Sequence, residues 1–298
     1  MAVNQIRSME RKKLFWLAIV CIVPGLLIYG FFNLLSICKT LQYSTLDWNG
    51  MNKGLFVGLK NYAKLLKDPR MSGAVAHNLV LMVTSICIQL PFALFIAMAL
   101  NSVTFGSKFF RTVFFLPMLF STVATGIMWQ LFFDPMSGIL MKFLKVFIPG
   151  MKNIAFLADM HKAMPAILVV ICWQFIPFYM ILLKAGLANI PAELYEAATI
   201  DGANRWNCFW NITLPQMIPT LRTSAVLSMV GSLKYFDLVW IMTGGGPQGA
   251  TELMATYMYK KGFVEFEMGY ASSIASVMFV ICFVFACCFL YVTRAREE

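Results

Sequence analysis

Charged side chains are scarce in this sequence, and that scarcity indicates its class. Asp, Glu, Lys and Arg make up 13% of its 298 residues, whereas 60% are hydrophobic and the mean hydropathy is +0.73. Soluble domains usually carry about 25% charged residues. Several apolar stretches reach the roughly 20 residues that a helix needs to cross a bilayer. The composition therefore predicts an all-α integral membrane protein and disfavours soluble-enzyme folds.

Side chains that catalyse reactions or bind metals are also rare. The two histidines, His77 and His161, fall at the edges of apolar runs. The eight cysteines show no CxxC spacing and lie mostly inside apolar runs, where cysteine acts as a small hydrophobe. Asp237 is the only acidic residue deep in such a run. We therefore expect no metal site, no structural disulfide and no catalytic centre, which leaves a polytopic membrane enzyme without support.

Patterns that bind phosphate or nucleic acid are missing as well. No GxxxxGK[ST] loop occurs, and the glycine-rich TGGGPQGAT at residues 243–251 lacks the Lys-Ser/Thr ending. The net charge of +10 is scattered over loops without a basic stripe, so we expect no binding of nucleic acid. In membrane proteins such charges set topology and meet lipid headgroups. The chain is predicted to hold no cofactor of its own.

Six apolar runs predict one transmembrane domain, residues 14–298, behind a short tail of residues 1–13. The first run is too long for the apolar core of a cleaved signal, and no A-x-A site follows it. The predicted spans are residues 14–37, 78–100, 109–133, 163–186, 216–242 and 269–292.

An even number of spans places both termini on one side of the membrane. Lys and Arg are shared almost equally between the two sides, so a raw count does not orient the chain. The first helix usually weighs most, and Arg7, Arg11, Lys12 and Lys13 precede it. We therefore expect both termini in the cytoplasm.

The long inner loop, residues 187–215, is more polar and more regular than a simple connection. Pro191 suits the first position of a helix, good helix formers follow it, and Gly202 is free to take the positive φ that ends one. Aromatic residues then recur at helical spacing up to Pro215. The pattern predicts two short helices joined by a glycine turn. On physical grounds alone, a lipid-facing amphipathic loop and a docking site for another protein are equally good interpretations.

One motif in this loop favours the docking site. Glu196-Ala197-Ala198, then Gly202, then Ile212 to Pro215 match the EAA motif, which reads EAA, three residues, Gly, nine residues, I-x-L-P. The loop thus resembles that of the permease subunits of binding-protein-dependent ABC importers. FVGLKNYAKLL, RTVFFLPMLFSTVATGIMWQLFF and TGGGPQGAT resemble the carbohydrate-uptake class, and within it the larger permease of maltose-type importers in a short six-span form. The resemblance covers nearly the whole chain.

The resemblance implies a six-helix ABC importer permease bundle in a bacterial or archaeal cytoplasmic (inner) membrane. Its EAA loop is then a coupling helix that docks on a cytoplasmic ATPase, and ATP and Mg²⁺ bind to the ATPases and not to this chain. The implied partners are a second permease in a heterodimer, two ATPase subunits and an extracytoplasmic sugar-binding protein, besides membrane lipid. The expected docking residues are Leu194, Tyr195, Glu196, Ala197, Ala198 and Gly202.

Polar and aromatic clusters lie in the fourth and fifth spans, and polar groups inside a membrane tend to mark a pathway. The hydroxyl groups of a sugar need hydrogen-bond partners, and its apolar ring face stacks on aromatic rings. Helix packing is the competing interpretation, because small and aromatic residues are also common at transmembrane interfaces. Alignment with the maltose-type permease implies sugar contacts at Gln174, Phe175, Phe178, Ser228, Gly231, Ser232 and Tyr235, although the residue types differ at most of these positions.

Two charges, Lys234 and Asp237, lie in the fifth span at a spacing of i, i+3. On a continuous helix this spacing permits an ion pair, and we favour a structural pair over a site for a charged substrate. The predicted function is a permease for an oligosaccharide or a related neutral solute. The alternative is a stand-alone secondary transporter or channel, which would need inverted repeats with broken helices, and the sequence shows no convincing pair of these.

Overall fold

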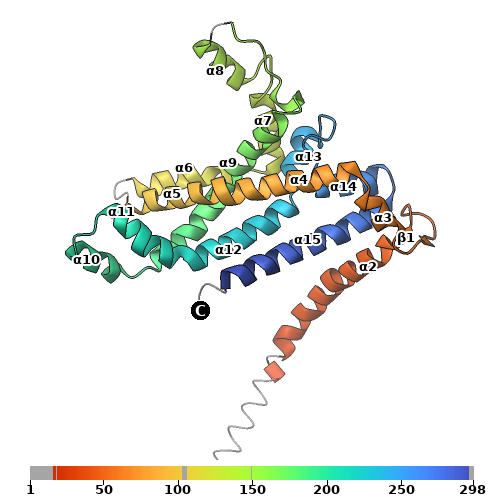
Figure 1. Ribbon diagram of the computed structural model, residues 1–298, viewed down its shortest axis with the longest axis horizontal. Helices are drawn as coiled ribbons and strands as arrows, with labels where there is room; N and C mark the ends of the chain where they lie inside the picture. Colours follow the sequence, from red (N-terminus) through yellow and green to blue (C-terminus); the bar gives the residue numbers. More distant parts are fainter. Residues whose placement is uncertain (1–15, 18, 103–105, 149, 295–298) are drawn as a thin grey trace, which may run out of the picture. The chain divides into compact units, whose positions relative to one another are not determined.

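The structure is a computed structural model that describes residues 16–17, 19–102, 106–148 and 150–294 (Figure 1). These residues form helices and a single two-stranded hairpin, so the all-α membrane fold predicted from composition is confirmed. The chain divides into two compact units, Met1–Leu65 with Lys261–Ser276, and Leu66–Lys260 with Val277–Glu298. The predicted tail, residues 1–13, lies outside the described residues.

The first unit combines a long apolar helix with a small extramembranous cap. The helix runs over Ile19–Ser44, and none of its apolar window is buried inside the chain. Asn61 secures the cap, because its side-chain amide donates hydrogen bonds of 2.9 Å to the carbonyls of Ser44 and Leu46. Its elements are η1 (Gly30–Leu34), α2 (Leu35–Ser44), β1 (Leu46–Asp47) paired antiparallel with β2 (Leu55–Phe56), α3 (Lys60–Leu66), η5 (Lys260–Val264) and the start of α15 (Met268–Arg294).

The second unit is a helical bundle in which α4–α5, α9 and α12 lie side by side (Figure 1). Its elements are α4 (Pro69–Thr84), η2 (Ser85–Gln89), α5 (Leu90–Ser102), α6 (Ser107–Leu119), α7 (Thr122–Phe132), α8 (Ile139–Phe147), η3 (Phe156–Ala158), α9 (Ala163–Ala188), α10 (Ala192–Ile200), α11 (Arg205–Cys208), η4 (Phe209–Thr213), α12 (Leu214–Leu233), α13 (Asp237–Thr243), α14 (Met254–Tyr259) and the end of α15. The elements η2 and η4 are π-helical turns within longer helices.

Four straight helices of the described residues are long and apolar enough to cross a membrane, or up to six if each of two bent pairs is one span. The straight ones are Ile19–Ser44, Pro69–Asn101, Ala163–Ala188 and Met268–Tyr291. The second of these begins at Pro69, nine residues before the predicted span at 78–100, because Asp68 caps its N-terminus through a hydrogen bond from the Arg70 N–H.

The predicted span at 109–133 is broken and not straight. Lys108–Leu119 and Thr122–Phe132 meet at an angle of 94°, with Phe120 and Ser121 in extended backbone between them. Pro117 lies in the last turn of α6, where its missing N–H and its ring disfavour continuation of the helix. The fifth span is also bent, by 40°, between Arg205–Leu233 and Asp237–Thr243.

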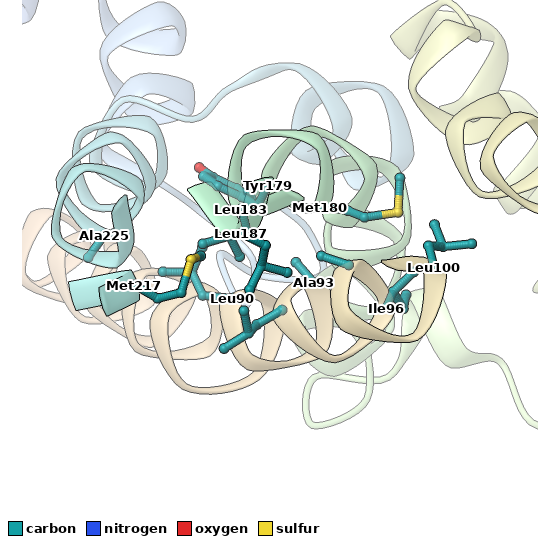
Figure 2. Close-up of a cluster of buried hydrophobic side chains, with 12 residues drawn as sticks. Leu90, Ala93, Ile96, Leu100, Tyr179, Met180, Leu183, Leu187, Met217 and Ala225 are labelled. Atoms are coloured by element: carbon teal, nitrogen blue, oxygen red, sulfur yellow. The ribbon is translucent and has the colours of Figure 1, made fainter. Parts of the chain in front are cut away.

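Apolar side chains of three helices pack together in the core of the second unit (Figure 2). Leu90, Ala93, Ile96 and Leu100 of α5 face Tyr179, Met180, Leu183 and Leu187 of α9, and Met217 and Ala225 of α12 complete the cluster. Gly186 allows α9 to approach α12 closely, because a Cβ there would lie 2.7 Å from the Thr220 hydroxyl oxygen. These contacts fix the spacing of the helices that carry both candidate sites.

The buried side-chain amide of Asn78 connects the ends of two helices in the same unit. Asn78 donates to the carbonyls of Ser232 and Leu233 at 2.7 and 3.1 Å and accepts from the Met254 N–H at 2.9 Å. It thereby satisfies carbonyls at the end of α12 and an N–H at the start of α14, groups that a helix leaves without internal partners. The last turn of α12 is therefore held in a fixed position beside α4.

Candidate functional site

A small cavity of about 70 Å³ lies between η2, α9 and α12 in the second unit. The fifth span contributes Ser228, Gly231, Ser232 and Tyr235 to its lining, and the aromatic side chains there include Phe175. The rings of Phe175 and Tyr235 meet edge to face at 5.9 Å. A water molecule occupies about 30 Å³ of liquid, so in this conformation the cavity has room for only a few waters.

Three polar atoms of the fourth and fifth spans, which both contribute to the cavity lining, are buried without a hydrogen-bond partner among the described residues. They are the Gln174 Oε1, the Ser228 Oγ and the Tyr235 hydroxyl. Gln174 is 4% exposed and Ser228 is 2% exposed, so bulk solvent does not supply the missing partners. Leaving such a group unpaired costs on the order of 1–3 kcal/mol, which makes the position a natural site for a polar guest.

The structure brings together most, but not all, of the residues predicted to bind a substrate. Phe175, Ser228, Gly231, Ser232 and Tyr235 line the cavity. Gln174 is buried next to Phe175 on α9 but does not line it. Phe178 is 37% exposed and does not line it either, because it projects from α9 away from the packed side.

Five lining residues were not among the predicted contacts: Leu81, Ser85, Gln89, Ile171 and Tyr179. Two of them, Ser85 and Gln89, are polar residues of the second span. Both are buried, and the Ser85 hydroxyl donates to Gln89 Oε1 at 2.9 Å and lies 3.3 Å from the Ser232 hydroxyl. They belong to the π-helical turn η2, a type of distortion that is frequent at functional sites. Two polar residues at i, i+4 within an apolar span were the signal that could have found them.

The ion pair predicted between Lys234 and Asp237 is wrong. No ion pair or hydrogen bond joins them within the part of the chain that the structure describes. The prediction assumed a continuous helix, whereas α12 ends at Leu233 and α13 begins at Asp237. Both side chains are exposed.

The inner loop contains two short helices and a glycine turn, as the pattern predicted. After α10 the Ala203 N–H donates to the Ala198 carbonyl at 2.9 Å and the Gly202 N–H donates to the Thr199 carbonyl at 3.1 Å. This pairing is a Schellman motif, whose C′ residue takes a left-handed conformation. Gly202 has a φ of +76°, which a residue with a Cβ adopts only with strain.

The helix α10 presents one face to solvent and attaches to the loop with the other. The hydroxyls of Tyr195 and Thr213 share a hydrogen bond of 2.9 Å, so the Tyr195 side chain ties α10 to η4. Leu194, Glu196 and Ala197 are exposed, as the docking prediction requires, and Ala198 is half-buried. Ile200 is 86% exposed at the end of α10 and was not among the predicted docking residues.

Comparison with known proteins identifies the family. The model of the family "Binding-protein-dependent transport system inner membrane component" matches residues 89–297. The chain belongs to this family. It is an inner-membrane permease component of a transport system that depends on a binding protein.

The similarity to two relatives and to one solved structure covers nearly the whole permease. A probable ABC transporter permease of Pyrococcus horikoshii is 33% identical over 94% of this chain and 96% of its own length. The multiple sugar-binding transport system permease protein MsmF of Streptococcus mutans is 32% identical over 90% of this chain and 91% of its own. A crystal structure of a bacterial ABC transporter that imports the acidic polysaccharide alginate has the same fold, with a TM-score of 0.86, 22% identity, and coverage of 98% of this chain and all of that one.

Membership of this family argues against the alternative of a stand-alone secondary transporter or channel. A permease that depends on a binding protein works as part of a multi-component system. The stand-alone transporter or channel therefore loses its support.

Proposed function

We propose that this permease is the membrane subunit of an ATP-driven sugar importer, and that it couples to a cytoplasmic ATPase through α10. In this proposal it pairs with a second permease, two ATPase subunits and an extracytoplasmic sugar-binding protein. The observation that carries the proposal is that α10 is exposed, ends in a hydrogen-bonded glycine turn and is tied by Tyr195 to η4. Family membership supports the transport role, and the remaining steps rest on the geometry that follows.

Coupling requires a short stiff element that transmits force, and α10 has that construction. Its end is closed by the Schellman turn at Gly202, and its side is tied to η4 through Tyr195. Because η4 continues directly into α12, a displacement of α10 is passed to the helix that lines the cavity. One row of exposed side chains along α10 consists of Leu194, Ala197 and Ile200, spaced at i, i+3 and i+6. This row can pack into a groove on a partner.

The charge of α10 suits a protein partner. Glu196 is exposed on α10 and offers a carboxylate for charge-assisted hydrogen bonds. Ala197 is small enough to let a partner approach the helix backbone. A helix that only lay on the membrane would favour lysine or arginine on its polar face, and α10 has none.

The proposed substrate is a neutral sugar or oligosaccharide. The unpaired Gln174, Ser228 and Tyr235 atoms supply an acceptor and two hydroxyl groups, which match the hydroxyls of a sugar. The edge-to-face rings of Phe175 and Tyr235 offer apolar surface for its ring face. The name of the Streptococcus relative, which refers to multiple sugars, points in the same direction.

Co-purification tests the coupling part of this proposal. The tagged permease is extracted gently from its native membrane, and mass spectrometry identifies the proteins that come with it. We expect a second permease and an ATPase with the parent chain. We expect Gly202→Asp to retain the second permease and to lose most of the ATPase, because a β-carbon and a charge at φ +76° distort the end of α10.

A second variant at the same position serves as the control, because it replaces Gly202 with a residue that tolerates the left-handed conformation and carries no charge. Asparagine tolerates the left-handed conformation better than other residues with a side chain, so Gly202→Asn is expected to retain at least half of the ATPase. If the parent chain is isolated alone, or if Gly202→Asp keeps its full complement of ATPase, the coupling role of α10 is refuted.

A further inference from the structure

The break between α12 and α13 places two opposite charges inside a membrane-spanning segment. Arg205–Leu233 and Asp237–Thr243 together are long and apolar enough to cross a bilayer, with a bend of 40° between them. Lys234 and Phe236 leave helical geometry, with φ/ψ of −106°/12° and −138°/−54°. Lys234 ends the first half, and Asp237 begins the second.

Neither charge is neutralised by the protein that surrounds it. Both side chains are exposed, and neither makes an ion pair or hydrogen bond with any other described residue. A charge in hydrocarbon costs at least about 2.5 kcal/mol, and charged residues within spans almost always face a cavity or a polar partner. Two such charges on one break would be too costly against lipid, which places them toward water.

The charges lie next to the cavity already described. Tyr235, which lines the cavity, precedes Asp237 by two residues. Lys234 follows the lining residues Gly231 and Ser232 by three and two residues. The polar lining of the cavity therefore continues onto the two charges of the break.

An aromatic cluster accompanies them. Phe236 and Trp240 are stacked, with ring centroids 5.5 Å apart and planes at 17°. Tyr259 meets the Trp240 ring at 4.7 Å and the Phe236 ring at 5.4 Å. All three residues are half-buried, so each keeps some ring surface in contact with the surroundings.

From this arrangement we infer that Lys234, Asp237 and the Phe236–Trp240 stack form a second solute subsite, which selects polyhydroxylated solutes of zero net charge. The inference rests on the proposed function and extends it from the cavity to the break. The Asp237 carboxylate accepts hydrogen bonds from hydroxyl groups, the Lys234 ammonium donates to them, and the aromatic stack receives an apolar ring face. A solute with net charge of either sign is attracted by one residue and repelled by the other, so it gains nothing overall.

Cysteine labelling tests whether the two residues face water. In the complete importer, carrying this permease with its native cysteines replaced, Lys234→Cys and Asp237→Cys are treated with charged methanethiosulfonate reagents. Leu227→Cys, an exposed apolar position on α12, and Leu233→Cys, a buried one, serve as controls. Only a hydrated thiolate reacts, so we expect the first two to react at least about tenfold faster than the controls.

The sign of the reagent then tests the charge selection. Lys234→Cys leaves the Asp237 carboxylate and is expected to prefer the cationic ethyltrimethylammonium reagent. Asp237→Cys leaves the Lys234 ammonium and is expected to prefer the anionic ethylsulfonate reagent. We expect the two preferences to differ by about fivefold or more, in line with Coulomb attraction at close range. Adding Asp237→Asn to Lys234→Cys should abolish the cationic preference.

The outcomes distinguish this inference from the proposed function. If both cysteines react no faster than the controls, the residues face lipid or the second permease and the inference is overturned. If they react without a preference for charge, the selection is overturned although the break is hydrated. Either result leaves ATPase co-purification intact, whereas loss of the ATPase interaction would refute the coupling role without altering the labelling.

Discussion

A substitution of Ser228 can show whether a single residue of the cavity serves helix packing or solute binding. Its hydroxyl is buried and meets no described residue with hydrogen-bond geometry, although the Tyr179 hydroxyl lies near it in the same cavity lining. Replacing an unpaired buried polar group with an apolar one is neutral or stabilising. We therefore expect Ser228→Ala to keep or slightly raise the midpoint of thermal unfolding, while the importer's sugar uptake falls about fivefold or more, the loss of one to two hydrogen bonds to a ligand.

The nearby Ser224 supplies the control for that experiment. Its hydroxyl donates to the Thr220 carbonyl of the same helix at 2.8 Å, and it does not line the cavity. Ser224→Ala is expected to leave uptake within about twofold of the parent, because it removes only a bond internal to the helix. Equal uptake by the Ser228→Ala variant and the parent would mean that this side chain is a packing residue.

The sequence indicates candidate polar residues of the fifth span, but it does not indicate which residues surround them. Ser228, Ser232 and Tyr235 are identified by sequence because a polar group in an apolar run is costly. Ser85 and Gln89 meet them only through the π-helical turn η2, which no residue spacing predicts. The error at Lys234 and Asp237 has the same origin, since their distance depends on a helix break that hydropathy does not reveal.

The crossing of α9 and α12 is the contact between elements that the structure makes easiest to test. A Cβ at Gly186 would lie 2.7 Å from the Thr220 Oγ1 and 2.9 Å from its Cγ2, and a β-branched side chain has little freedom to move aside. We expect Gly186→Ala to destabilise the protein by about 1–3 kcal/mol, the usual cost of overpacking. Thermal unfolding of the purified protein in lipid nanodiscs measures the effect.

Relief of the same clash provides the internal check. Thr220→Ala removes the two closest atoms, so the Gly186→Ala/Thr220→Ala double variant should recover most of the lost stability. Gly73→Ala on α4, where a Cβ meets nothing within 4 Å, should be neutral or stabilising. A double variant no more stable than Gly186→Ala would show that the two helices do not meet as described.

At the level of elements, continuous hydropathy predicted where helices lie but not where they turn. Residues 109–133 read as a single span because the apolar character is unbroken across Phe120 and Ser121. Those two residues are extended, and α7 leaves α6 at 94°. A proline at position 117 permits such a break without requiring it, since neighbouring helices often satisfy the backbone groups that a proline frees.

The orientation of the whole molecule in the membrane follows from a few terminal charges and leads to a prediction for two distant loops. A cytoplasmic N-terminal flank, as its basic residues predict, would place α10 inside and the glycine-rich segment 244–251 outside. Asn207 is exposed in the first loop, and Gln248, which already carries a side chain, is exposed in the second. Each position accepts a single cysteine in a background without native cysteines.

A reagent that cannot cross the membrane should therefore modify the two positions from opposite sides. In intact cells we expect Gln248→Cys to be labelled and Asn207→Cys to be protected, and in inside-out vesicles the reverse. This result requires an odd number of crossings between the loops, which the bent pair Arg205–Leu233 and Asp237–Thr243 supplies as one span. Labelling of both positions from the same side would make that pair a re-entrant loop, and the path from α10 through α12 to the cavity would then no longer cross the bilayer.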